Sequence, residues 1–282
     1  MSSSALRLKL LTMLCVVGAL ILTFVIFFKI SSIEVSNARE DAVKAQLPDG
    51  QEQAADASDE NAPHAYYTRE EIIAASGIEA GDNLLTLNKA AVASRIKARL
   101  PYIDEVQIKR SFPNGVTILV TEFEQSYAIC DEAGGWWLIS RDGTVLEQTQ
   151  EREVKTHICV SGTQITVPSP GETIRPAGAE GADVTELAAK KDAVIRMLQT
   201  LEANPEIEKH VVSVDVSASY DIVMMYGTQY EVRLGTTEEL VYKFAYLQGV
   251  LREFEQQKRT YLSGVIDITF SEGRNARFQP FG

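Results

Sequence analysis

The chain has 282 residues, of which 45% are hydrophobic and 23% are charged, a composition that is ordinary for globular proteins and argues against wholesale disorder. Its formal net charge is −12, and all 39 acidic residues follow residue 28. This acidity disfavours nucleic-acid binding and charge-driven adhesion to anionic lipid as functions of the chain beyond residue 28.

An apolar segment near the start is the strongest local signal. Residues 10–28 read LLTMLCVVGALILTFVIFF without a charged residue, and about 20 apolar residues cross a bilayer as a helix. A cleaved signal peptide has a shorter apolar region of roughly 7–15 residues and ends at small residues, which are missing here. The segment therefore predicts one transmembrane helix, preceded by a short cytoplasmic tail over residues 1–9. Arg7 and Lys9 in this tail give a mild bias towards an N-terminus inside the cell.

Composition changes twice after this segment. A short β-prone run holds Ile30, Ile33 and Val35. Residues 36–64 are then rich in Ala, Gln, Asp and Glu and nearly free of large apolar side chains. Such a stretch buries too little surface to remain ordered unaided, so we expect a flexible insertion over residues 36–64.

Two helices and two strands are predicted next. The Thr68 hydroxyl and the Glu71 carboxylate form the pattern of a capping box, and Gly77 suits the left-handed residue that closes many helices. A second helix begins at Asn88 and stops at Pro101. Strands follow over residues 103–110 and 116–123, joined by a turn of the Pro-Asn-Gly type. Residues 30–123 thus read β-α-α-β-β, a compact α+β unit.

The region over residues 124–282 is predicted to mix strands with two long helices. One helix ends at Asn204-Pro205, and the other begins at a capping box formed by Thr236 and Glu239. The strands, predicted from short apolar runs between turn signals, cover residues 127–130, 136–139, 145–146, 211–216, 221–226, 230–234, 264–270 and 275–278. Together these elements predict a multi-stranded sheet with two covering helices.

Three cysteines allow one disulfide outside the apolar segment. Cys15 lies inside that segment, which leaves Cys130 and Cys159 in two strand-like runs. The two form a disulfide if their strands are neighbours and their Cα atoms lie within about 7 Å, and otherwise remain buried free thiols. Both readings stay open, and no metal-type cysteine spacing is present.

Catalytic patterns are weak throughout the chain. The three histidines do not form an H-E-x-x-H pattern, and G-x-S-x-G, G-x-G-x-x-G and the phosphate-binding loop pattern are absent from the sequence. Ser94 and Lys97 match S-x-x-K, but the S-D-N and K-T-G patterns that accompany it in penicillin-binding enzymes are missing. Cys159 and His157 lie two apart in a strand-like run without a third orienting group. We therefore predict no enzyme, no cofactor and no metal site, with a membrane-anchored cell-wall enzyme as the alternative.

Several segments spread over nearly the whole chain form one recognisable set. They are Ile33-Glu-Val35, Tyr67-Thr-Arg-Glu-Glu-Ile72, Ser76-Gly-Ile-Glu-Ala-Gly-Asp-Asn-Leu-Leu85, Leu100-Pro-Tyr-Ile103, Val106-Gln-Ile-Lys-Arg110, Phe112-Pro-Asn114, Val120-Thr-Glu122, Leu138-Ile-Ser-Arg-Asp-Gly-Thr-Val145 and Val265-Ile-Asp-Ile-Thr-Phe270. In order and spacing these segments resemble the FtsQ/DivIB family of bacterial cell division proteins. The resemblance implies a POTRA domain over residues 30–123 and a so-called β domain over residues 124–282. The 36–64 insertion departs from the family pattern, which passes directly from the first strand to the first helix.

The same resemblance implies a function. Family members are non-enzymatic scaffolds of the division complex, the divisome, and bind FtsL/DivIC-type and FtsB-type coiled-coil partners outside the membrane, linking them to septal peptidoglycan synthesis. The family's C-terminal strand binds a partner by β-addition, which implies the partner-binding residues Ile268, Thr269, Phe270, Arg274 and Phe278 here. Localisation at the division septum and an N-terminus in the cytoplasm are expected on the same ground, without a nucleic-acid or small-molecule ligand.

Overall fold

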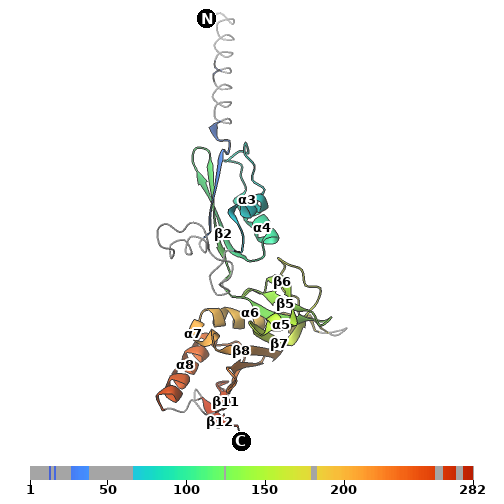
Figure 1. Cartoon of the computed structure of the whole chain (residues 1–282), viewed down its shortest axis with the longest axis vertical. Helices are drawn as coiled ribbons and strands as arrows, with labels where there is room; N and C mark the ends of the chain where they lie inside the picture. The colour runs from blue at the N-terminus through green and yellow to red at the C-terminus, as the bar shows by residue number, and fades with distance from the viewer. Residues whose placement is uncertain are drawn as a thin grey trace, which may run out of the picture. The chain divides into compact units, whose positions relative to one another are not determined.

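The computed structural model of the chain describes residues 13, 16, 27–37, 66–123, 125–178, 183–257, 263–270 and 276–281. It divides into two compact units, Met1–Glu122 and Phe123–Gly282, and each is described by itself (Figure 1). The predicted transmembrane segment and the tail before it lie almost entirely outside the described residues. Among the residues that are described, no helix is both long enough and apolar enough to cross a membrane.

The first unit is a three-stranded sheet packed against two helices (Figure 1). Its strands lie in the order β1-β3-β2, with β1 parallel and β2 antiparallel to the central strand β3. The bounds are β1 Ser32–Asn37, α3 Arg69–Ser76, α4 Lys89–Arg99, β2 Ile103–Ser111 and β3 Gly115–Glu122. The predicted β-α-α-β-β order is confirmed, with both helices contributing to the same hydrophobic core as the sheet.

Local capping chemistry sets the helix ends of this unit as predicted. The amide of Glu71 donates to the Thr68 hydroxyl at 3.3 Å, and the Glu71 carboxylate accepts from the Thr68 amide at 2.8 Å. Gly77 closes α3 with a left-handed φ of 62°. At the start of α4, the Asn88 side chain accepts from the amide of Ala91 at 3.1 Å. These contacts satisfy backbone groups that a helix end leaves without an intrahelical partner.

A buried carboxylate joins the two flanks of the predicted insertion. Strand β1 continues through Asn37, so the expected start of the insertion at residue 36 is wrong by two residues. The Asn37 side chain is fully buried and donates to Glu122 at 2.9 Å. Glu122 also accepts from the amides of Tyr66 and Tyr67 at 2.9 and 3.2 Å. These hydrogen bonds fix the chain immediately before and after residues 38–65, which lie outside the described residues.

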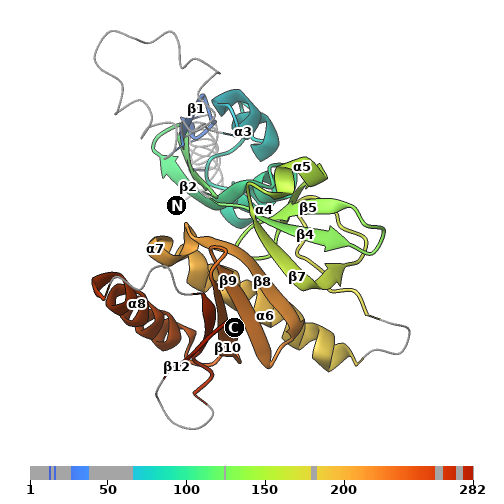
Figure 2. The ribbon, with the colours of Figure 1, turned by 60° about the horizontal axis from the view of Figure 1, so that its bottom comes forward.

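The second unit is a nine-stranded mixed sheet in the order β12-β11-β10-β9-β8-β7-β4-β5-β6. Helices α6 and α8 lie beside the sheet (Figure 2). They bury Met197, Leu198, Phe244 and Leu247 in one hydrophobic cluster with it. The bounds are β4 Tyr127–Asp131, β5 Trp136–Ile139, β6 Val145–Thr149, α5 Glu151–Val154, β7 Ile158–Ile165, α6 Val184–Glu202, α7 Pro205–Glu208, β8 Val211–Ala218, β9 Asp221–Tyr226, β10 Tyr230–Gly235, α8 Leu240–Gln256, β11 Gly264–Asp267 and β12 Arg277–Pro280.

The predicted capping box of the last helix is wrong. Helix α8 begins at Leu240, and Glu239 precedes it with a left-handed φ of 54° and no capping hydrogen bond from its side chain. The Thr236 hydroxyl instead accepts from the amide of Glu238 at 3.3 Å, which makes a local turn. Lys243 binds this turn because its Nζ, which is buried, donates to the carbonyls of Leu234 and Thr236 at 2.7 and 2.8 Å. Burial lowers the pKa of Lys243 below its usual value.

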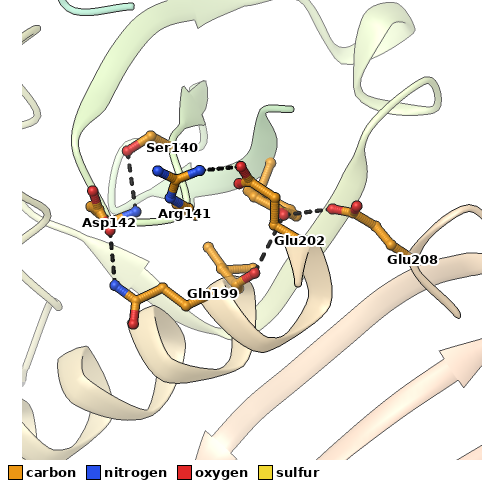
Figure 3. A network of polar contacts seen from close by, with 8 residues as sticks. Ser140, Arg141, Asp142, Gln199, Glu202 and Glu208 are labelled. Carbon is orange, nitrogen blue, oxygen red and sulfur yellow. Dashed lines mark hydrogen bonds and ion pairs between the residues drawn. The ribbon is translucent and has the colours of Figure 1, made fainter. Parts of the chain in front are cut away.

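A polar network fastens the β5–β6 turn to helix α6 (Figure 3). Arg141 forms an ion pair with Glu202, and Asp142 accepts from the Gln199 side chain at 2.8 Å. The Ser140 hydroxyl accepts from the amide of Asp142 at 3.3 Å and shapes the turn. The predicted turn over Arg141-Asp-Gly-Thr144 is thus bound to helix α6, a contact that the turn pattern in the sequence does not indicate.

The same network includes a buried tyrosine. Tyr127 is fully buried on β4, and its hydroxyl donates to a carboxylate oxygen of Glu208 on α7 at 2.6 Å. Burial is the main cause that raises the pKa of Tyr127, and the adjacent Glu208 raises it further. The phenol therefore stays protonated and acts as the donor to Glu208.

Asp131 organises the turn between β4 and β5. Its carboxylate accepts from the indole of Trp137 at 2.9 Å and from the amides of Ala133 and Gly135 at 2.9 and 2.7 Å. The Trp137 hydrogen bond is the largest cause that lowers the pKa of Asp131, and the amide donors add to it. The charged form of Asp131 is therefore favoured in the folded state.

We expect Asp131→Asn to destabilise the second unit at pH 7 and to lose this effect in acid. Because the pKa of Asp131 is lower in the folded than in the unfolded chain, its contribution is present above the unfolded value of about 3.9 and disappears as the pH falls through the folded value. Urea unfolding followed by tryptophan fluorescence measures this, since the two tryptophans of the chain, Trp136 and Trp137, both lie in β5. If the difference in unfolding free energy between parent and variant does not change with pH, the stabilising role of the charged Asp131 carboxylate is contradicted.

Candidate partner-binding edge

The short strand β12 forms one edge of the nine-stranded sheet. It pairs antiparallel with β11, with Ile266 opposite Phe278 and Gly264 opposite Pro280. Strand β11 in turn pairs parallel with β10. Within the described part of the chain, β11 is the one strand paired with β12, so the other side of β12 faces away from the sheet.

Hydrogen-bond alternation decides which backbone groups face outwards. The amide of Phe281 donates to the carbonyl of Ser263 at 2.9 Å. Along an antiparallel strand, the amide and carbonyl of successive residues point alternately towards and away from the neighbouring strand. Those of Gln279 therefore point towards β11, as at Phe281, whereas those of Phe278 point away from β11. Pro280 directs a carbonyl outwards and has no amide to donate. The outer edge of β12 therefore presents a donor–acceptor pair at Phe278 and an acceptor at Pro280.

Aromatic packing holds β12 on the sheet. The Phe278 ring contacts Phe254 of α8 and Tyr230 of β10, with centroid distances of 5.1 and 6.4 Å and edge-on geometries. Tyr230 is buried, and its ring also lies 5.8 Å from Phe254. Such pairs stabilise packing beyond the area that they bury. One face of Phe278 is thus used for folding, while the backbone of the same residue faces outwards.

Gly264 is needed because β12 approaches it closely. A Cβ atom at this position would lie 2.3 Å from the carbonyl oxygen of Gln279 and 2.8 Å from the Cα of Pro280. Both are backbone atoms, so neither moves aside without shifting β12. Glycine at the first position of β11 is therefore a condition for the pairing of the last two strands.

A tight turn ends β11 earlier than predicted. The expected strand over residues 264–270 stops at Asp267, whose carboxylate accepts from the amide and hydroxyl of Thr269 at 2.9 and 2.8 Å. Phe270 follows with a left-handed φ of 58°, and its ring lies 5.7 Å from Tyr242 and 5.5 Å from Tyr246. Side-chain hydrogen bonding of this kind favours turns over strands.

The predicted interface residues occupy different environments. Ile268 is fully buried and its amide donates to the carbonyl of Arg233 at 2.9 Å, so its side chain supports the sheet from within the core. Thr269 and Phe270 form the turn, and Phe278 lies on the edge strand. Arg274 lies outside the described residues. The predicted last strand, residues 275–278, is observed as β12 over Arg277–Pro280.

The sequence interpretation missed two residues of this edge, Gly264 and Tyr246. The Tyr246 hydroxyl accepts from the amide of Ala276 at 3.3 Å, and its ring contacts Phe270. One side chain of α8 thus contacts the residues immediately before and after residues 271–275. The available signal for Gly264 was a glycine directly before an apolar strand. Tyr246 offered only its place on the amphipathic helix α8.

The residues of the enzyme alternative show no activated nucleophile. Burial raises the pKa of Cys159, with Cys130 as a second cause, so its thiolate is disfavoured. The Nδ1 of His157 instead lies 3.2 Å from the Ser126 hydroxyl. Cys130 and Cys159 lie on the adjacent strands β4 and β7 and are free thiols. Ser94 and Lys97 lie exposed on α4. Over the described residues, no group of three His, Cys, Asp or Glu side chains is arranged to hold a metal.

Comparison with known protein families gives two adjoining matches. The family described as "POTRA domain, FtsQ-type" matches residues 63–123, and "Cell division protein FtsQ/DivIB, C-terminal" matches residues 128–268. The second match covers the sheet from β4 to the turn after β11 and ends before β12.

The chain belongs to the FtsQ/DivIB family. Its relatives include cell division protein FtsQ of Streptomyces griseus, 28% identical over 158 residues that cover 56% of this chain and 68% of the relative. Cell division protein DivIB of Clostridium botulinum strain Hall is 25% identical over 206 residues, 72% of this chain and 73% of the relative. FtsQ of Anaeromyxobacter sp. strain K is 26% identical over 210 residues, 74% of this chain and 61% of the relative. The relatives of this FtsQ/DivIB protein are thus named for cell division.

Proposed function

We propose that this FtsQ/DivIB protein is a non-enzymatic scaffold of the bacterial divisome. It binds FtsL/DivIC-type and FtsB-type membrane partners outside the cytoplasmic membrane and links them to septal peptidoglycan synthesis. Residues 10–28 anchor it as a single-pass protein with the N-terminus in the cytoplasm, and the POTRA domain and β domain lie outside the cell membrane. Family membership supports the role in division.

The observation that carries the partner-binding part of the proposal is the outward-facing edge of β12. Its Phe278 amide and carbonyl point away from β11, which is the geometry that a further strand needs to add to a sheet. The Thr269 and Phe270 turn lies at the end of β11, where the Phe270 ring packs against Tyr242 and Tyr246 of α8. We assign Thr269, Phe270, Arg274 and Phe278 to the partner interface, with Ile268 supporting them from the core.

Deleting residues 277–282 is expected to abolish co-purification of the FtsB-type partner while the protein still folds. A longer deletion from Val265 is less informative because it also removes Ile266 and Ile268, which are fully buried in the core. Residues 277–281 are mostly exposed, so the shorter deletion leaves most of the hydrophobic cluster in place. The measurement is affinity purification of the tagged full-length chain from dividing cells, with an unchanged tryptophan emission spectrum as the folding control.

Fluorescent localisation tests the wider role. Midcell recruitment of the full-length chain in dividing cells is the expected result. A chain distributed evenly around the envelope would reject the divisome assignment, and partner binding that survives the deletion of residues 277–282 would reject the interface alone.

A further inference from the structure

Three segments of the POTRA unit meet beside the end of the predicted anchor. They are the stretch after Phe27, the loop before Leu85 and the tip of the β2–β3 hairpin around Phe112 (Figure 1). The backbone hydrogen bonds that join them are Ile30 N to Asp82 O at 2.8 Å, Gly81 N to Ile30 O at 2.8 Å, Leu84 N to Phe28 O at 2.9 Å and Ser31 N to Asn114 O at 2.9 Å.

Large apolar side chains are exposed at this end of the unit. Phe112 at the hairpin tip is 64% exposed, Phe27 is 58% exposed and Leu85 is 37% exposed. Phe28 packs edge-on against both Phe27 and Phe112, with centroid distances of 5.6 and 5.9 Å. Three aromatic rings from two distant parts of the sequence therefore form one continuous contact row with apolar surface facing outwards.

The position of Phe28 in the chain indicates what covers this row. Phe27 and Phe28 are the last two residues of the charge-free segment over residues 10–28. If this segment crosses the bilayer, Phe28 lies at the boundary of the hydrocarbon region, and Phe112 is in direct contact with it. Apolar faces that carry Phe, Trp and Leu bury at the boundary between headgroups and acyl chains, because their rings and alkyl groups leave water there without entering the centre of the bilayer. Lys29 follows immediately and suits the headgroup level.

We propose that Phe27, Phe28, Leu85 and Phe112 form a lipid-docking surface that inserts into the boundary between headgroups and acyl chains. The proposal rests on the proposed membrane anchor and goes beyond it, because the hairpin tip and the loop before Leu85 join the bilayer as additional contacts. The same end carries Lys29 and Arg110 as well as Asp82, so its charges are mixed and the feature that its exposed side chains share is apolar surface. The anchor end, the loop before Leu85 and the hairpin tip then all contact the bilayer. Together they fix the orientation of the POTRA unit relative to the membrane plane.

Depth-dependent quenching of a tryptophan at position 112 tests this surface. The full-length Phe112→Trp chain is reconstituted into phosphatidylethanolamine and phosphatidylglycerol vesicles that contain lipids brominated near the headgroup end of the acyl chain. Tyr66→Trp is the matched control, because Tyr66 is 45% exposed in the same unit and its amide binds Glu122 at the opposite end of β3. The eight residues of β3 separate the two positions by about 25 Å.

Brominated lipid is expected to reduce the emission of Phe112→Trp beyond the loss seen for the parent chain, which carries only Trp136 and Trp137. Tyr66→Trp is expected to match the parent. An unquenched Phe112→Trp chain that still resists carbonate extraction from the vesicles would overturn the docking surface and leave the anchor standing. Release of the chain by carbonate would reject the anchor, and the docking surface with it.

Discussion

Replacing Gly264 by alanine is expected to weaken binding of the proposed FtsB-type partner at least tenfold, which corresponds to about 1.4 kcal/mol. The added Cβ would lie 2.3 Å from the carbonyl oxygen of Gln279, a contact that forces β12 away from β11. The outward amide and carbonyl of Phe278 then lose the position that a partner strand requires. The change introduces no charge and removes no side chain, so it tests the backbone geometry of the edge alone.

Gly249→Ala is the matched control for this experiment. Gly249 lies within helix α8, and a Cβ there would meet no atom within 4 Å. Alanine in a helix interior stabilises by up to about 1 kcal/mol relative to glycine, so this variant keeps partner binding and gains stability. Titration of the full-length chain with a partner segment gives both dissociation constants. Equal affinity of Gly264→Ala and parent chains would show that the partner does not add to β12.

Removing the Tyr127 hydroxyl is expected to lower the unfolding free energy of the second unit by about 1.5–3 kcal/mol, the usual value of a hydrogen bond to a charged group. Tyr127→Phe keeps the ring in its fully buried site and removes the hydroxyl that donates to Glu208 at 2.6 Å and, at a longer 3.4 Å, to the carbonyl of Leu198. Glu208 is itself buried, so the variant leaves a desolvated carboxylate with one donor fewer. Urea unfolding followed by the emission of Trp136 and Trp137 reports on this unit within the full-length chain.

A double-mutant cycle isolates the interaction. Tyr127→Phe, Glu208→Gln and the double variant together give the coupling energy of the pair, which we expect at about 1–3 kcal/mol. Tyr220→Phe is the control, because Tyr220 is 74% exposed and its substitution is expected to change stability by at most about 0.5 kcal/mol. Additive effects of the two single substitutions would show that the network in Figure 3 does not depend on this hydrogen bond.

The pKa of Tyr127 adds a dependence on pH to the same experiment. Burial and Glu208 raise the pKa in the folded state, so the unfolded chain loses this proton first as the pH passes about 10. The stability that comes from the protonated phenol is therefore present below pH 10 and declines above it. Tyr127→Phe is expected to have a shallower loss of stability in this range than the parent chain.

Local chemistry in the sequence determined most of the secondary structure. The capping box of Thr68 and Glu71 and the helix end at Asn204-Pro205 predict helices that the structure contains as α3 and α6. Predicted strands over residues 136–139 and 221–226 match β5 and β9 to the residue. These signals act over a few residues, through side-chain hydrogen bonds to the backbone and through the alternation of buried and exposed positions, and are therefore readable before the fold is known.

The capping box predicted at Thr236 is absent, and a buried lysine of the following helix binds the same segment. Lys243 on the first turns of α8 reaches back to the carbonyls of Leu234 and Thr236, and this holds the preceding residues in a turn outside the helix. Thr and Glu at the spacing of a capping box thus do not form one here, where the buried Lys243 side chain binds the same segment. Early termination of β11 at Asp267 has a local cause, the hydrogen bonds from Thr269, which the apolar pattern concealed.

What the sequence by itself determined is the family, the order of elements in the first unit, and most strands and both long helices of the second, although it missed the central strand β7 and the short helices α5 and α7. It also placed a strand near the C-terminus, for which partner binding stays a proposal. Only the tertiary structure decided which groups of that strand face outwards, because the direction of each amide depends on its pairing with β11. It also decided that Ile268 belongs to the core and that Gly264 is required, since both follow from the approach of β10 and β12 to the same strand. Contacts between residues far apart in the chain, such as Phe28 with Phe112 and Asn37 with Glu122, leave no periodic trace in the sequence and appear only once the chain is folded.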